Sequence, residues 1–339
     1  MFGDNLPKPS PWPSDFPLPP GVYFQHYLAS IRNGERQLMS MLRNINALNE
    51  NGLPPARSIL HNGPRAIERN CARYATLMRE VGFDPAFGYG LDGRNDSDGT
   101  RLTATKKGEI MAGVARRTGS RLVLADLEGA HDTKTGPTDD TDEAGALLMG
   151  RTFREKTRDL PRIVVFDQSW FAIQSHGDNR VPVKPIGQGG SFKGFPQDEL
   201  AAWVDASALQ PYWRNFPQDN AYPFVFNWME RDYASYEGNL AKLDPKLIRP
   251  RTVTMQGYRH EKKPWDFVHA LINYSDRPVI IWSDPHPVAM TLRCVKAARM
   301  IAKLGFKGSR AVADFQRSTN GKLTVDNAAG EEVFKYLGV

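Results

Sequence analysis

The sequence predicts an α/β protein whose main domain is a (β/α)8 TIM barrel, followed by a short helical segment at the C-terminus. From residue 21 onward, short apolar runs alternate with longer amphipathic stretches, which is the rhythm of strands followed by helices. Eight predicted strands and about eight helical segments end near residue 305, a length that suits this barrel. No glycine-rich phosphate loop follows the first run, which argues against an open doubly wound sheet.

Each predicted strand is a short run rich in apolar, β-branched or aromatic residues. In chain order, the predicted strands cover residues 21–28, 56–63, 84–93, 121–132, 162–170, 221–230, 251–260 and 277–287. The predicted helices between and after them cover residues 35–52, 64–82, 105–120, 142–160, 197–216, 264–275 and 288–306. The second helix has clear limits, because Pro64 stands in its first turn and Gly82 at its end.

Three segments differ in character along the chain. Residues 1–20 are rich in proline and are expected to form an extended N-terminal arm. Residues 21–305 hold the barrel, and residues 306–339 form a C-terminal helical segment.

Composition and charge exclude several kinds of protein. The net charge is +6, with acidic and basic residues interspersed, so we expect weak attraction to an anionic polymer and no specific nucleic-acid partner. No apolar run reaches 18 residues, so no membrane insertion is expected. The two cysteines, Cys71 and Cys294, form no metal motif and are expected to be buried thiols; we expect no cofactor and no metal.

Two carboxylates mark the end of the fourth predicted strand, in the stretch RLVLADLE. Asp126 and Glu128 are two residues apart, so on a strand their side chains lie on the same face. Two close carboxylates do not both ionise readily, so one of them keeps a proton near neutral pH. Glycoside hydrolysis needs such a general acid beside a charge that stabilises the transition state. We expect Glu128 to be the acid and Asp126 its partner.

The ends of the other predicted strands supply acids, amides and aromatic rings to the same mouth, as carbohydrate sites do. We expect Asp284 to complete the catalytic set, with Asp92 and Asp167 as further candidates for that carboxylate. The expected substrate-binding residues are Tyr89, Asp92, Asp167, Trp228, Gln256, Tyr258 and Trp282.

A D-x-E motif at the end of strand four resembles the family 25 glycoside hydrolases, the muramidases of phages and bacteria. In that family strand six offers an aromatic residue, as Trp228 would, and strand seven often ends in Gln followed by Tyr, as Gln256 and Tyr258 do loosely. The resemblance implies cleavage of peptidoglycan. The family begins strand one with an aspartate in a G-x-D-x-S pattern, where this chain has Gln25 and His26.

The C-terminal segment resembles the second half of a small three-helix peptidoglycan-binding domain. The residues in register are Phe315, Gln316, Leu323, Val325, Asp326, Gly330 and Leu337. Asn327 stands where that domain has a loop glycine. The alternative is a helical hairpin that covers the barrel. The N-terminus lacks the pattern of a secretory signal, so we expect synthesis in the cytoplasm and action at the cell wall after lysis, through a holin or within a particle.

Other functions remain open from the sequence. The D-x-E motif and Trp282 are also similar to family 18 chitinase-like enzymes, although the upstream acids of their longer motif are missing. A catalytically inactive barrel, serving as a binding or structural module, is another alternative. A metal-dependent hydrolase is a third, because imidazoles at a barrel mouth could hold a divalent ion with Asp167 or Asp284. Its candidate ligands are His26, His61, His131, His176, His260 and His286.

Overall fold

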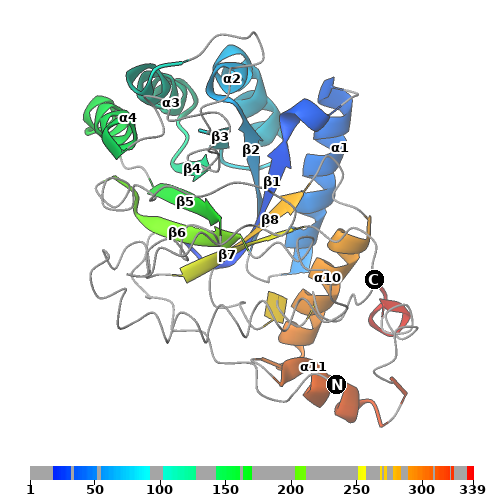
Figure 1. Cartoon of the computed structure of the whole chain (residues 1–339). Helices are drawn as coiled ribbons and strands as arrows, with labels where there is room; N and C mark the ends of the chain where they lie inside the picture. The colour runs from blue at the N-terminus through cyan, green and yellow to red at the C-terminus, as the bar shows by residue number, and fades with distance from the viewer. Residues whose placement is uncertain are drawn as a thin grey trace, which may run out of the picture.

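Eight parallel strands pair in chain order and close into a barrel in the computed structural model (Figure 1). The strands are β1 (Gly21–Tyr27), β2 (Ala56–Asn62), β3 (Ala86–Gly90), β4 (Leu122–Asp126), β5 (Ile163–Ser169), β6 (Ala206–Gln210), β7 (Arg251–Gln256) and β8 (Pro278–Ser283). The barrel closes because β8 pairs with β1, from Gly21 opposite Pro278 to His26 opposite Ser283. The structure describes residues 18–31, 34–51, 55–91, 102–126, 143–160, 163–169, 203–210, 251–256, 268, 271–272, 278–283, 289–307, 310–320, 322–323 and 334–339.

Helices follow the strands on the outside of the barrel (Figure 1). They are α1 (Gly34–Asn46), α2 (Pro64–Glu80), α3 (Ala104–Thr118), α4 (Glu143–Lys156), α10 (Ala289–Lys303) and α11 (Ala311–Ser318), with 3-10 turns η1 (Leu28–Ser30) and η2 (Ala47–Asn51). Between β7 and β8, the described residues 268 and 271–272 are helical and buried. The α/β class is therefore confirmed, while a complete strand–helix alternation stays a prediction.

The sixth strand differs from the prediction. Residues 197–216 were expected to be helical, but Ala206–Gln210 form β6 and pair with β5. The predicted strand 221–230 lies outside the described residues. Alanine and leucine favour helices, but intrinsic propensity is a weak preference that pairing with neighbouring strands overrides. The Asp205 carboxylate accepts a hydrogen bond from the Val164 amide at 2.7 Å, and the Asp205 amide donates to the Val164 carbonyl at 2.8 Å, so the junction into β6 is anchored on β5.

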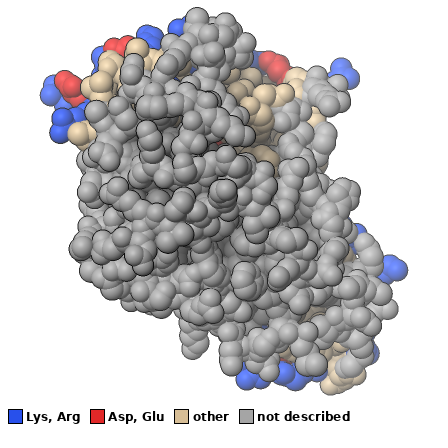
Figure 2. All heavy atoms as spheres, viewed as in Figure 1, with Lys and Arg blue, Asp and Glu red and all other residues tan. Residues whose placement is uncertain are grey.

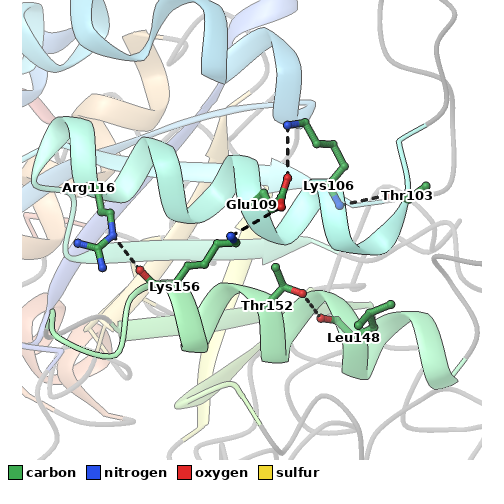
Figure 3. A network of polar contacts seen from close by, with 7 residues as sticks. All are labelled: Thr103, Lys106, Glu109, Arg116, Leu148, Thr152 and Lys156. Carbon is green, nitrogen blue, oxygen red and sulfur yellow. Dashed lines mark hydrogen bonds and ion pairs between the residues drawn. The ribbon is translucent and has the colours of Figure 1, made fainter.

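Polar contacts join α3 to α4 along their exposed sides (Figure 3). The Glu109 carboxylate lies 3.4 Å from Lys106 Nζ and 3.7 Å from Lys156 Nζ, so it links both helices. Arg116 Nε donates to the Lys156 carbonyl at 2.8 Å. Thr103 caps α3 by accepting a hydrogen bond from the Lys106 amide. These exposed ion pairs contribute little individually to stability.

Charged side chains of both signs mix on the outer helices. Figure 2 shows basic and acidic side chains close together along the edge formed by α2, α3 and α4. An ion pair of 2.6 Å joins Arg73 of α2 to Glu35 of α1. Along this edge, the positive charge is therefore not gathered into one basic patch. Within the described residues, no helix has the length and apolar character needed to cross a membrane.

The C-terminal helices pack on α10. The rings of Phe306 and Phe315 lie 5.6 Å apart, and those of Phe315 and Tyr336 6.1 Å apart. The Arg293 guanidinium of α10 lies 4.5 Å from the ring centroid of Phe334. Buried residues of this segment belong to the same apolar core as the barrel. This packing favours a helical cover over a separate wall-binding lobe, while the domain limits themselves stay predictions.

Candidate active site

Asp126 ends β4 at the carboxyl end of the barrel, where the sequence predicts the chemistry. Its side chain is 13% exposed, and its register neighbours are Gly90 on β3 and Asp167 on β5. Strand β4 ends at Asp126, so Glu128 falls just beyond it. The predicted residues that lie outside the described residues are Glu128, Asp92, Asp284, Trp228 and Tyr258.

His61 of β2 contacts Asp126 from two strands away. Its Nε2 atom lies 3.5 Å from Asp126 Oδ2, and the His61 side chain is 7% exposed. Strand β3 runs between β2 and β4, so the imidazole has to pass over β3. It can do so because β3 presents Gly88 and Gly90 on that side: a Cβ atom on Gly88 would lie 2.7 Å from His61 Cδ2, and one on Gly90 would lie 3.7 Å from His61 Cε1.

Burial sets the charge of His61. Loss of water lowers the pKa of His61 to about 4, so the imidazole is neutral at neutral pH. Among the described residues, neither ring nitrogen of His61 makes a hydrogen bond of standard geometry, and the approach of Nε2 to Asp126 is a long one. The ring that approaches the Asp126 carboxylate is therefore neutral. It does not supply a positive charge to compensate the negative charge of that carboxylate.

Tyr89 does not line the mouth of the barrel, where the sequence analysis expects it as a substrate-binding residue. It stands between Gly88 and Gly90, so its side chain points to the opposite face of β3. Tyr89 is 1% exposed, and burial raises its pKa well above the ordinary value, with Cys71 and Glu68 of α2 adding to the shift. Tyr89 therefore packs between the barrel and α2.

His26 also faces the helices, whereas the alternative of a metal-dependent hydrolase would need it at the mouth of the barrel. The ring of its neighbour Tyr27 lies 5.9 Å from that of His61, so Tyr27 is on the inner side and His26 on the other. His26 stacks on Phe24 at 6.3 Å, and its Nε2 lies 3.4 Å from Ser58 Oγ. Burial lowers the pKa of His26 to about 3.

No group of three or more potential metal ligands lies together in the part of the chain that the structure describes. The other candidate histidines, His131, His176, His260 and His286, lie outside it.

The opposite side of the barrel brings two predicted residues together by register. Trp282 on β8 is the register neighbour of Gln256 on β7 and of Gln25 on β1. Gln25 is completely buried. The side-chain positions of Gln256 and Asp167 lie outside the described structure, so only their backbones are placed.

Sequence reasoning missed two features of this site. The first is Tyr27, the last residue of β1, which is 38% exposed and which the strand pattern does not single out. The second is the pair of alternating glycines in AFGYG, which the strand pattern alone does not explain. Glycine inside a strand signals a close approach by another group, and that signal could have indicated the space over β3.

No protein family and no curated protein sequence matches the chain. Its structure is similar to that of a GH18 chitinase from Pseudoalteromonas aurantia, with 12% identity, a TM-score of 0.49, and coverage of 83% of this chain and 98% of that one. It is also similar to the PgaB glycoside hydrolase domain from Bordetella bronchiseptica, with 12% identity, a TM-score of 0.46, and coverage of 83% and 99%.

A third similar structure is that of L-ribulose 3-epimerase, with 13% identity, a TM-score of 0.48, and coverage of 86% of this chain and 97% of that one. These proteins share little sequence with the chain and superpose on it only in part. The barrel is therefore established by the strand pairing, and the activity has to be argued from the residues.

Proposed function

We propose that the protein is a glycoside hydrolase that cleaves peptidoglycan, with Glu128 as the general acid and Asp126 as its partner. The observation that carries the proposal is the position of Asp126: a mostly buried carboxylate at the carboxyl end of β4, inside the mouth of a closed parallel barrel. Its neighbour His61 is neutral, so this contact leaves the carboxylate charge in place.

Such a carboxylate suits a reaction in which positive charge develops on the sugar. The departing oxygen takes a proton from the general acid, and the ring passes through a state resembling an oxocarbenium ion. A negative charge held away from water stabilises that state more strongly than one in solvent, because the local dielectric is lower. Glu128, two residues further along the chain, would donate the proton.

Peptidoglycan is the substrate that the sequence pattern favours. The D-x-E motif at Asp126 and Glu128 resembles that of the muramidases, and the net charge of +6 suits an anionic wall polymer. The protein would reach the wall after lysis or as part of a particle. The fold proposed with this function includes helices after β5 and β6, which would complete the (β/α)8 alternation.

The test measures release of reducing sugar ends from purified peptidoglycan. The proteins compared are the wild type, Glu128→Gln and the matched control Glu155→Gln, which alters an exposed glutamate of α4. The expected result is cleavage by the wild type and the control, and a loss of roughly a hundredfold to ten-thousandfold in Glu128→Gln, the range found for removal of a general acid.

Two other outcomes have distinct meanings. A wild type that binds the wall without cleaving it would support the non-catalytic alternative. The observation favouring that alternative is Gln25, which is completely buried on β1 where the muramidases carry an acid. A wild type that neither binds nor cleaves peptidoglycan would show that the wall is not its substrate.

A further inference from the structure

The contact between His61 and Asp126 depends on a glycine floor, defined here as Gly88 and Gly90 of β3. The imidazole starts on β2, crosses this floor and ends 3.5 Å from the carboxylate on β4. A side chain at Gly88 would overlap the ring, since its Cβ atom would lie 2.7 Å from Cδ2 and 3.3 Å from Cβ of His61. The two glycines therefore leave the space through which a side chain of β2 reaches a side chain of β4, although β3 lies between these strands.

The chemistry of the two groups fixes the direction of the contact. A carboxylate only accepts hydrogen bonds, and a neutral imidazole has one N–H group and one bare nitrogen. A bare Nε2 facing Asp126 Oδ2 would place two lone pairs against each other in a buried site. With Asp126 ionised, the arrangement is favourable only when Nε2 carries the proton and directs it toward Oδ2, which leaves Nδ1 bare.

We infer that His61 is a positioning residue: its neutral imidazole donates a long hydrogen bond, at 3.5 Å, from Nε2 to Asp126 and orients the carboxylate without adding a positive charge beside it. A lysine or arginine in this position would also orient the carboxylate but would neutralise it. The neutral donor adds no positive charge that would compete with the charge developing on the sugar. The catalytic part of this inference rests on the proposed function, whereas the hydrogen bond itself does not.

The hydrogen bond is tested without any substrate. Long-range nitrogen–proton NMR spectra of the full chain, at neutral pH, report which ring nitrogen of each of the seven histidines carries a proton. The His61→Leu variant assigns the signal. The expected result is a neutral His61 with the proton on Nε2, and a changed signal in Asp126→Asn. A proton on Nδ1, or a doubly protonated ring, would overturn the inference.

The positioning role is tested by kinetics on peptidoglycan with two matched pairs. His61→Gln keeps an amide donor of similar reach, whereas His61→Leu removes it. We expect His61→Leu to lower kcat by about tenfold to a hundredfold with little change in KM, and His61→Gln to recover most of that loss. Gly88→Ala should lose more than Gly90→Ala, because a Cβ on Gly90 makes only ordinary contact with the ring, at 3.7 Å from Cε1.

The outcomes separate this inference from the proposed function. An active wild type with equal kcat in His61→Leu and His61→Gln would overturn the positioning role alone. A wild type that never cleaves peptidoglycan would overturn the proposed function and the catalytic role of His61, and the NMR result would still decide the hydrogen bond. Thermal unfolding of each variant shows whether a loss of kcat reflects misfolding. If His61→Leu misfolds, the kcat of His61→Gln relative to that of the wild type becomes the measure of the positioning role.

Discussion

Gly150 of α4 lies directly against the indole of Trp203, the buried residue that leads into β6. A Cβ atom on Gly150 would fall 2.0 Å from Trp203 Cγ. The Arg154 side chain on the same helix donates to the Trp203 carbonyl at 2.8 Å and to the Asp205 carboxylate at 2.7 Å. The entry into β6 is therefore held against α4 by a packing contact that only glycine allows and by hydrogen bonds from one arginine.

Replacing Gly150 by alanine should destabilise the protein strongly. The added methyl group cannot fit unless Trp203 moves, and overpacking of a buried site costs about 3 kcal/mol or more at this degree of overlap. Gly113→Ala is the matched control, because a Cβ there meets nothing within 4 Å on a helix of the same layer. That change should raise stability by about 1 kcal/mol. Urea unfolding of the two variants measures both effects. Equal free energies of unfolding for Gly150→Ala and Gly113→Ala would contradict the close contact between Gly150 and Trp203.

Stability should fall as the pH decreases from about 6.5 toward 4. Burial lowers the pKa of His61 to about 4 and that of His26 to about 3, below the ordinary value of 6.5 in the unfolded chain. The unfolded chain therefore binds more protons in this range, and stability rises with pH. Between pH 6.5 and 5, each histidine should account for roughly 2 kcal/mol of the unfolding free energy. Urea unfolding at several pH values measures the slope, and His26→Gln should reduce it. An unchanged slope in this variant would show that His26 does not contribute to the pH dependence of stability.

The two thiols should resist modification in the folded protein. Cys71 and Cys294 are both completely buried, and burial raises the pKa of Cys294 to about 12. Because the thiolate is the reactive form, Cys294 should react at pH 8 more than about a thousandfold more slowly than an exposed thiol. Ellman's reagent should detect neither thiol in the native protein and both after addition of urea. A native thiol that reacts within seconds would contradict the burial, and Cys71→Ala would identify it.

The C-terminal helical residues should stabilise the barrel through α10. Phe334 is 1% exposed and lies under the Arg293 guanidinium. Phe334→Ala should cost about 3 kcal/mol because it removes a buried ring, and Arg293→Ala about 1 kcal/mol because it removes the cation–ring contact. Lys296→Ala, at an exposed position of the same helix, serves as the control and should change little. Thermal unfolding compares the three. A Phe334→Ala variant as stable as the control would show that this segment folds apart from the barrel.

The sequence by itself determined the α/β class, seven of the eight strands that the structure describes, and the position of Asp126 at the carboxyl end of β4. These features depend on local patterns: apolar runs of strand length, amphipathic helical stretches, and the acid that ends an apolar run. Such patterns are present in the chain before it folds, so they can be read without knowing which segments become neighbours.

The tertiary structure alone decided β6, the outward direction of Tyr89 and the contact between His61 and Asp126. The residues of β6 favour a helix by composition and become a strand because β5 pairs with them. The direction of a side chain on a strand reverses with a shift of one residue, so it is fixed only when the register is fixed. His61 of β2 contacts Asp126 of β4 because Gly88 of β3 leaves space for the imidazole. The contact involves three strands, so no pattern within a single segment of the sequence predicts it.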